Sequence, residues 1–133
     1  MMMAKVIFLQ AISFSLIKFF LVGISNTFVG LSAIYLVTWS FGVSASIANA
    51  AGYLLGLMVS FVLNKRWTFH HGGPIVPAFI RFIAIFAIAY LANLGTVLIL
   101  IEQFRVNEYL AQAAGIPPYT ILFYLGSRYI AFR

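Results

Sequence analysis

The chain has 133 residues, of which 64% are hydrophobic and only 8% are charged. Because a soluble domain carries about a quarter charged residues, the eight lysines and arginines and the two acidic residues cannot cover a surface in water. The composition therefore excludes a soluble protein and predicts an all-α integral membrane protein. The formal net charge of +6 comes from cations at the ends of apolar segments, which indicates contact with lipid phosphate groups rather than nucleic acid.

The N-terminal segment, residues 1–17, is expected to lie at the cytoplasmic interface of the membrane. Its apolar stretch, residues 6–17, is too short to span a bilayer and is interrupted by Gln10, Ser13 and Ser15, so we expect an interfacial lead-in. The segment resembles a signal peptide, but no clear small-x-small cleavage site follows and Lys18 comes soon after. We therefore expect it to be retained.

Four membrane-spanning helices are expected to follow, at about residues 19–39, 44–63, 79–101 and 109–127. Each holds about 20 residues, or roughly 30 Å of helix, which matches the hydrocarbon core of a bilayer. Together they form a single four-helix membrane domain over residues 18–133. Pro117 and Pro118 lie inside the fourth and weakest span, where we expect a kink or a break.

Charged residues set the expected orientation of these spans. Seven of the eight lysines and arginines fall on one side, namely Lys5, Lys18, Lys65, Arg66, Arg81, Arg128 and Arg133. Arg105 falls on the other side, together with Glu102 and Glu108. By the positive-inside rule, both chain ends and the middle loop are expected to be cytoplasmic.

The sequence also contains an internal repeat. The segment "IANAAG" at residues 47–52 matches "LAQAAG" at residues 110–115, and the same offset of 63 positions places Lys18 on Arg81. Near the ends of the copies an offset of 62 aligns two further pairs, Arg66 with Arg128 and Trp67 with Tyr129. Residues 17–69 and 80–132 are therefore expected to form two hairpins of one plan. Both enter from the cytoplasm, so the repeats are parallel, and repeated transporters place a site at the repeat interface.

Small and polar residues lie along one face of several spans. Gly52 and Gly56 form a small-xxx-small pair that permits close helix approach, and the glycine faces of the first two spans are also candidates for a homo-oligomer interface. The amides of Asn26, Asn49 and Asn93 are either packing residues or markers of a pathway, because an unpaired amide in lipid is costly.

A cation–aromatic block, "SFVLNKRWTF" at residues 60–69, ends the second span. Anchoring at the interface explains its charges, but not Asn64 directly before them or the repetition of the block near the C-terminus. Arginine binds phosphate through two hydrogen bonds and lysine acts as a point charge, so we expect a phosphate site, with amides along the path of its polar cargo. The candidate substrate-binding residues are Lys18, Asn26, Asn49, Asn64, Lys65, Arg66, Trp67, Arg81 and Arg128.

The sequence lacks the residues that several classes of function require. The predicted spans contain no Asp or Glu, and the chain contains no cysteine. A proton-driven exporter normally needs an intramembrane carboxylate, so an energised pump is disfavoured. We also find no nucleotide-binding loop, metal-ligand spacing or nucleophile–base pair, and the adjacent His70 and His71 are interpreted as loop residues. We therefore expect no catalytic residue, no metal, no cofactor and no enzyme activity.

The sequence resembles the GtrA-like family of small four-helix membrane proteins from about residue 17 to its end. The resemblance is carried by "IKFFLVGISNT" at 17–27, "ANAAGYLLGLMVSFVLNKRWTF" at 48–69 and "FIRF" at 79–82, with a degenerate second copy at 123–132. One departure is that the second block, which usually ends in an Asn–Arg–aromatic run, reads Gly126–Ser127–Arg128–Tyr129, and Ala131 falls where the final phenylalanine is expected.

The resemblance implies a protein of the cytoplasmic (inner) cell membrane that moves a polyprenyl-phosphate-linked monosaccharide from the cytoplasmic to the outer leaflet, for the glycosylation of cell-surface polysaccharides. Without an intramembrane carboxylate, this flipping is expected to be passive. The alternative is a non-transporting scaffold or accessory subunit for a glycosyltransferase or synthase. The expected partners are the lipid-linked sugar, membrane lipids, further copies in a homo-oligomer and a glycosyltransferase at the cytoplasmic face, with no nucleic acid.

Overall fold

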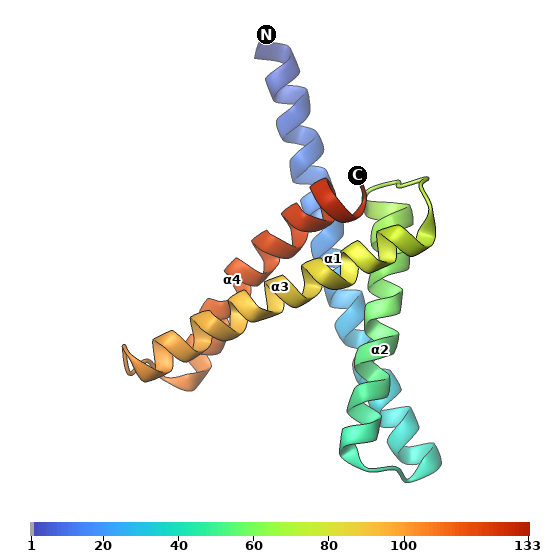
Figure 1. Ribbon diagram of the computed structural model, residues 1–133, viewed down its shortest axis with the longest axis vertical. Helices are drawn as coiled ribbons and strands as arrows, with labels where there is room; N and C mark the ends of the chain where they lie inside the picture. The colour runs from blue at the N-terminus through green and yellow to red at the C-terminus, as the bar shows by residue number, and fades with distance from the viewer. Residues whose placement is uncertain (1) are drawn as a thin grey trace. The chain divides into compact units, whose positions relative to one another are not determined.

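The computed structural model describes residues 2–133, which form four α-helices and two π-helical turns. In chain order these are α1 (Met2–Phe41), α2 (Ala45–Leu63), η1 (Asn64–Thr68), α3 (Ile75–Glu102), α4 (Glu108–Gly126) and η2 (Ser127–Ala131). The chain divides after Gly72 into two compact units. Each unit is a helical hairpin: α1 packs on α2 in the first hairpin, and α3 packs on α4 in the second (Figure 1).

The outer surfaces of these helices are apolar. Three helical segments are long and apolar enough to cross a membrane, namely Met3–Phe41, Ala45–Thr68 and Ile75–Glu102. Large apolar side chains such as Phe28, Tyr53 and Ile80 point outward and are exposed. Such a surface is stable in lipid and unstable in water. The prediction of an all-α, multi-pass membrane protein with four helices is confirmed, with α4 as the least apolar of the four.

The first helix is longer than the span predicted for it. α1 runs without interruption for 40 residues, which is about 60 Å and twice the thickness of a hydrocarbon core. The expected interfacial segment, residues 1–17, is therefore helical from residue 2 onward and continuous with the first span. The continuity has a simple cause, because no proline or glycine occurs in the chain before Gly23.

Glycines bring the two helices of the first hairpin together. A Cβ atom built on Gly52 would stand 2.7 Å from the carbonyl oxygen of Gly30 and would overlap Ile34. A Cβ atom on Gly56 would overlap the side-chain amide of Asn26. The close approach predicted for the glycine pair is thus confirmed. These contacts lie inside the hairpin, so Gly30, Gly52 and Gly56 are occupied by its own two helices, whereas Gly23 has no atom within 4 Å.

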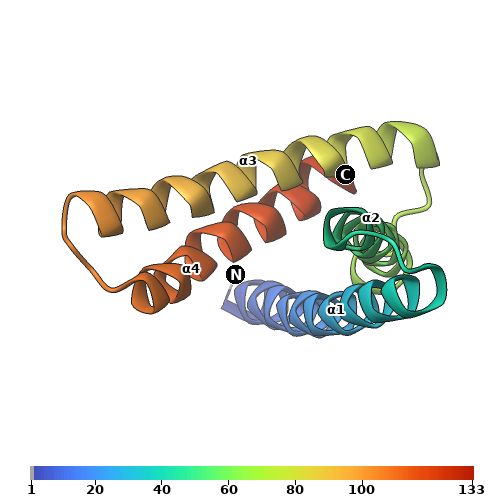
Figure 2. The same cartoon turned by 90° about the horizontal axis from the view of Figure 1, so that it is seen from below.

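The second hairpin packs through aromatic rings as well as glycines. Figure 2 shows α3 and α4 side by side. The ring of Phe82, which is fully buried, lies 5.0 Å from Phe123 and 5.6 Å from Phe132, measured between ring centroids. Gly126 and Gly115 provide space for Ile85 and Asn93 respectively. Tilted and edge-on ring pairs at these distances are favourable contacts, and they link η2 to the hairpin core.

The predicted break at the two prolines is wrong. Pro117 and Pro118 lie inside α4, which continues as one helix from Glu108 to Gly126. A proline ring fixes φ near −65°, which is a helical value, and the cost of proline in a helix comes from the lost N–H donor and from the clash of the ring with the carbonyl four residues back. Neighbouring helices and local adjustment offset that loss in membrane helices, so the hydrogen-bond loss at these positions does not end the helix.

Candidate functional site

The C-terminal end of α2 widens into the π-helical turn η1. The backbone N–H of Phe69 donates to the carbonyl of Asn64 at 2.9 Å, five residues back, and the N–H of His71 donates to the carbonyl of Lys65 at 2.8 Å, six residues back. His70 has φ of 50°, which is the left-handed conformation that commonly ends helices. Turns of π-helix are rare and occur frequently at functional sites, so η1 is a structural reason to examine this block.

The five residues of η1 are divided between the interior and the surface. Asn64 and Thr68 are buried, with 1% and 5% of their surface exposed. Arg66 and Trp67 are exposed. Residues four apart share a helical face, which explains why Asn64 and Thr68 point inward together. The turn therefore exposes one guanidinium and one indole, from consecutive residues, at the end of the first hairpin.

The two lysines at this end of the hairpin are bonded to backbone carbonyls. Lys65 Nζ donates to the carbonyl of His71 at 2.7 Å. Lys18 Nζ donates to the carbonyl of Trp67 at 3.2 Å and lies 4.7 Å from the ring centroid of Phe14 and 5.3 Å from that of Trp67. Within residues 2–133, Arg66 makes no side-chain hydrogen bond. Arg66 is therefore the cation of this group that is available for a bidentate contact with an anion.

Two buried polar atoms of η1 have no hydrogen-bond partner among residues 2–133. Asn64 Nδ2 donates to Ser60 Oγ at 3.2 Å. Asn64 Oδ1 and Thr68 Oγ1 are buried and find no hydrogen-bond partner among residues 2–133. A buried polar atom without a partner is destabilising. These two atoms are able to bond a hydroxyl group or a water molecule that reaches the inner side of the turn.

The second hairpin ends in a turn of the same kind, η2. The N–H of Phe132 donates to the carbonyl of Ser127 at 2.9 Å. Arg81 Nη2 donates to the carbonyl of Ala131 at 3.2 Å. Arg128 Nη1 donates to Tyr124 Oη at 3.2 Å. Ser127 is fully buried, and its Oγ has no partner among the described residues, so it matches Asn64 in both position and environment.

The two turns correct the alignment of the repeat. Both begin and end 63 positions apart, Asn64 with Ser127 and Thr68 with Ala131. The offset of 63 therefore holds to the end of each copy, without the shift to 62. In this register Phe132 occupies the position of Phe69, and Arg128 corresponds to Lys65 rather than to Arg66. The position of Arg66 is taken by Tyr129, so η2 does not repeat the exposed guanidinium of η1.

The nine predicted site residues do not form one cluster. Five of them meet at the end of the first hairpin, namely Lys18, Asn64, Lys65, Arg66 and Trp67. Arg81 and Arg128 lie at the corresponding end of the second hairpin. Asn26 is half-buried against Gly56, about 12 Å along α1 from Lys18. Asn49 is exposed, roughly 22 Å along α2 from the start of η1, so neither amide belongs to the turn.

Sequence reasoning missed two polar residues of the turns, Thr68 and Ser127. Thr68 follows Asn64 by one helical turn, so the spacing of the block could have indicated it. Ser127 stands 63 positions after Asn64, and the correct repeat register would have identified it. Among residues 2–133, no three histidine or acidic side chains gather as ligands for a metal ion.

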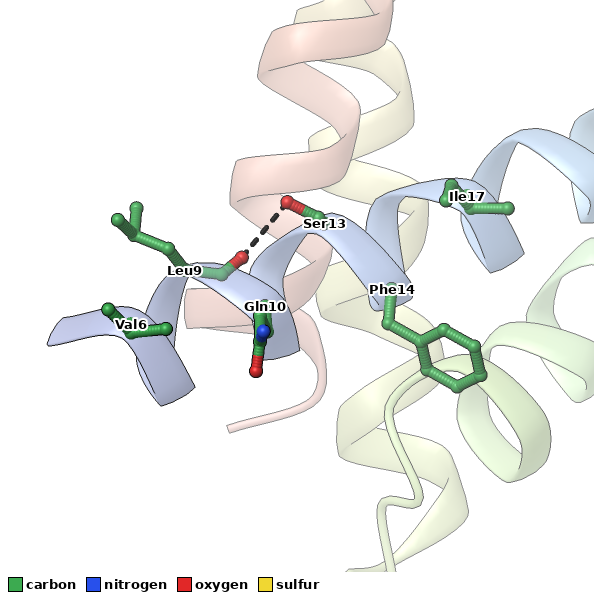
Figure 3. A pocket seen from close by; sticks show the side chains of 6 residues that line it. All are labelled: Val6, Leu9, Gln10, Ser13, Phe14 and Ile17. Carbon is green, nitrogen blue, oxygen red and sulfur yellow. Dashed lines mark hydrogen bonds between the residues drawn. The ribbon is translucent and has the colours of Figure 1, made fainter. Parts of the chain in front are cut away.

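A separate groove of about 380 Å³ lies on the N-terminal part of α1 (Figure 3). Its lining residues are Val6, Leu9, Gln10, Ser13, Phe14 and Ile17. Ser13 Oγ donates to the carbonyl of Leu9 at 3.0 Å, so its hydroxyl is satisfied within the helix. None of the lining residues is charged, and the groove therefore provides no group for holding a phosphate.

Comparison with known proteins places both hairpins in one family. The family described as GtrA/DPMS, transmembrane domain, matches residues 18–132, which include η1 and η2. The chain is also similar to the "Uncharacterized membrane protein YwcD" of Bacillus subtilis (strain 168). The two are 22% identical over 119 residues, covering 86% of this chain and 94% of that protein. The family match begins at Lys18, so the first part of α1 lies outside it.

Proposed function

We propose, since this chain belongs to the GtrA/DPMS transmembrane-domain family, that it flips a polyprenyl-phosphate-linked monosaccharide from the cytoplasmic to the outer leaflet of the membrane. The family assignment supports a membrane protein concerned with lipid-linked sugars. The side on which the lipid would be captured rests on the positive-inside orientation, which favours η1 at the cytoplasmic face of the membrane. In the outer leaflet, the lipid-linked sugar would be available for the glycosylation of cell-surface polysaccharides.

One observation carries this proposal: the exposed Arg66, whose side chain makes no hydrogen bond within residues 2–133, next in sequence to the exposed Trp67. A guanidinium forms two parallel hydrogen bonds with a phosphate. An indole is suited to the membrane interface, where one side of the ring is apolar and the other meets water. A phosphate joined to an isoprenoid tail has the matching polarity, because its tail would lie along the apolar outer surfaces of the helices.

The sugar would be handled by neutral polar groups. Asn64 Oδ1 and Thr68 Oγ1 are buried in the same turn and have no hydrogen-bond partner among residues 2–133, so they would be able to bond sugar hydroxyls that reach the inner side of the turn after capture. Asn26 and Asn49 lie further along the first hairpin and would offer later contacts. The chain has two acidic residues: Glu102, the last residue of α3, and Glu108, the first residue of α4. Movement would therefore be passive, without chemical conversion, and driven by consumption of the sugar outside.

A second candidate function is a scaffold for a glycosyltransferase or synthase, and the N-terminal part of α1 favours it. This part lies outside the family match and exposes Ile7, Phe8 and Leu9. An apolar helix surface that extends past the paired part of a hairpin is suited to contact another membrane-bound protein. A scaffold would hold its enzyme without moving lipid. By contrast, a flipping protein, acting as a homo-oligomer, would move lipid without the enzyme.

Reconstitution separates the two candidates. The purified chain would be placed in vesicles that contain a polyprenyl-phosphate-hexose, and exposure of the sugar in the opposite leaflet would be followed over time. Faster exposure than in protein-free vesicles supports flipping. Exposure at the protein-free rate, together with stable binding of a cytoplasmic-face synthase to the chain, would replace flipping with the scaffold function.

A further inference from the structure

Each hairpin contains one cation that reaches from its first helix to the π-helical turn at its end. Lys18 on α1 donates to the carbonyl of Trp67 in η1, and Arg81 on α3 donates to the carbonyl of Ala131 in η2, both at 3.2 Å. Lys18 and Arg81 are themselves 63 positions apart, which is the offset that relates the two turns. The same contact is therefore built twice, by lysine in one copy and by arginine in the other.

The carbonyls that receive these bonds lack a donor in their own turn. In an α-helix the carbonyl of Trp67 would accept from the N–H of His71, four residues on. That N–H instead donates to Lys65 at 2.8 Å, because the turn has widened. Ala131 is the last residue of η2, where helical carbonyls have no partner within the helix. A donor from the facing helix satisfies each carbonyl, and a positive charge is favourable at a helix C-terminus.

Lys18 is held in place by further contacts, and one nitrogen of the Arg81 side chain is enclosed. The Lys18 ammonium lies over the rings of Phe14 and Trp67, at 4.7 Å and 5.3 Å from their centroids, and such cation–ring contacts are attractive. Arg81 Nε is buried, so an anion approaching from outside cannot reach it. Arg66, by contrast, is exposed and makes no side-chain hydrogen bond within residues 2–133.

We propose that Lys18 and Arg81 are positioning residues, each of which holds the π-helical turn of its own hairpin and neither of which binds the substrate phosphate. In the first hairpin, the bond from Lys18 fixes the backbone at Trp67, the neighbour of Arg66, and so sets the direction in which the guanidinium points. That last step rests on the proposed function. The holding of the turns does not, because it depends only on contacts inside each hairpin.

Amide hydrogen exchange tests the proposal turn by turn in the full chain. The N–H groups of Phe69 and Phe132 close η1 and η2. Lys18→Met is expected to speed exchange at Phe69 by about tenfold, the equivalent of one net hydrogen bond, and to leave Phe132 unchanged. Arg81→Met is expected to do the reverse. Lys18→Arg and Arg81→Lys keep a cationic donor and are expected to restore slow exchange. Lys5→Met, on the same helix as Lys18, is the matched control and should change neither turn.

The outcomes separate this proposal from the proposed function. Unchanged exchange at Phe69 in Lys18→Met and at Phe132 in Arg81→Met would overturn it, and loss of lipid flipping in those same variants would then make the two cations ligands. If wild-type protein moves no lipid but the exchange pattern holds, flipping fails and the positioning role stands. Global unfolding would raise exchange in both turns of one variant. If a Met variant unfolds in this way, it is replaced by Lys18→Gln or Arg81→Gln, which keep an N–H donor. Exchange at Phe69 and Phe132 is then compared with wild type as before.

Discussion

The carbonyl oxygen of Gly30 on α1 stands so close to Gly52 on α2 that a Cβ atom at Gly52 would lie 2.7 Å from it. That contact fixes how α1 and α2 cross. Gly52→Ala is therefore expected to lower the free energy of unfolding by about 1–3 kcal/mol through overpacking. The measurement is an unfolding titration in mixed micelles.

The matched control is Gly23, around which no atom lies within 4 Å. Gly23→Ala should be neutral or slightly stabilising, because alanine favours helix. Equal effects of the two changes would contradict the packing of the first hairpin.

Ser127 offers a test of the second turn. Its hydroxyl is fully buried and has no partner among residues 2–133. Removing an unsatisfied buried polar atom loses no hydrogen bond, so Ser127→Ala is expected to change the free energy of unfolding by no more than about 0.5 kcal/mol, or to raise it. The comparison is Ser60→Ala, which removes the acceptor of Asn64 Nδ2 and should cost about 1 kcal/mol. A loss above about 1 kcal/mol for Ser127→Ala would mean that the hydroxyl is bonded to a water or lipid group.

Arg128 is expected to act on stability more than on substrate. It corresponds to Lys65 in the repeat, it donates to Tyr124 Oη at 3.2 Å, and its guanidinium carbon lies 5.7 Å from the ring centroid of Tyr129. A double-mutant cycle between Arg128→Ala and Tyr124→Phe should give a coupling energy of about 0.5–1 kcal/mol in unfolding. Flipping by Arg128→Ala should stay within about twofold of wild type once the folded fraction is equal. Additive effects on unfolding, or loss of flipping with normal stability, would show that Arg128 faces the substrate instead.

Much of this architecture follows from the sequence, because length and hydropathy decide where helices form in a membrane. The ranges predicted for the second and third spans lie close to α2 and α3. The long α1 was predicted in two parts, since Gln10, Ser13 and Ser15 weaken the apolar pattern without breaking the helix. The π-helical turns were not predicted. One bond to η1 comes from outside its own helix, because Lys18, which donates to the Trp67 carbonyl, lies on α1 and 49 residues before Trp67.

The candidate site was predicted in composition but not in detail. The block around Arg66 and Trp67 was identified from its charges and rings, and it does form a distinct turn. Side-chain identity then misled the repeat alignment, because pairing Arg66 with Arg128 required a gap, whereas the backbone pairs Asn64 with Ser127 without one. The sequence also could not distinguish Lys18 and Lys65, which donate to carbonyls of the chain, from Arg66, whose side chain makes no hydrogen bond within residues 2–133. That distinction depends on which carbonyls lie near Lys18 and Lys65 after folding.

The most direct test of the account is the rate of lipid flipping in vesicles by wild type, Arg66→Ala, Arg66→Lys and Arg105→Ala, at matched amounts of folded protein. Arg66 is the proposed phosphate ligand, whereas Arg105 lies in the loop after α3 on the predicted outer side. Loss of a charge-assisted, bidentate contact predicts that Arg66→Ala is slower than wild type by about tenfold or more, with Arg66→Lys between them. Arg105→Ala should stay within about twofold of wild type. Equal rates for Arg66→Ala and Arg105→Ala would contradict the proposed role of the turn in holding the lipid phosphate.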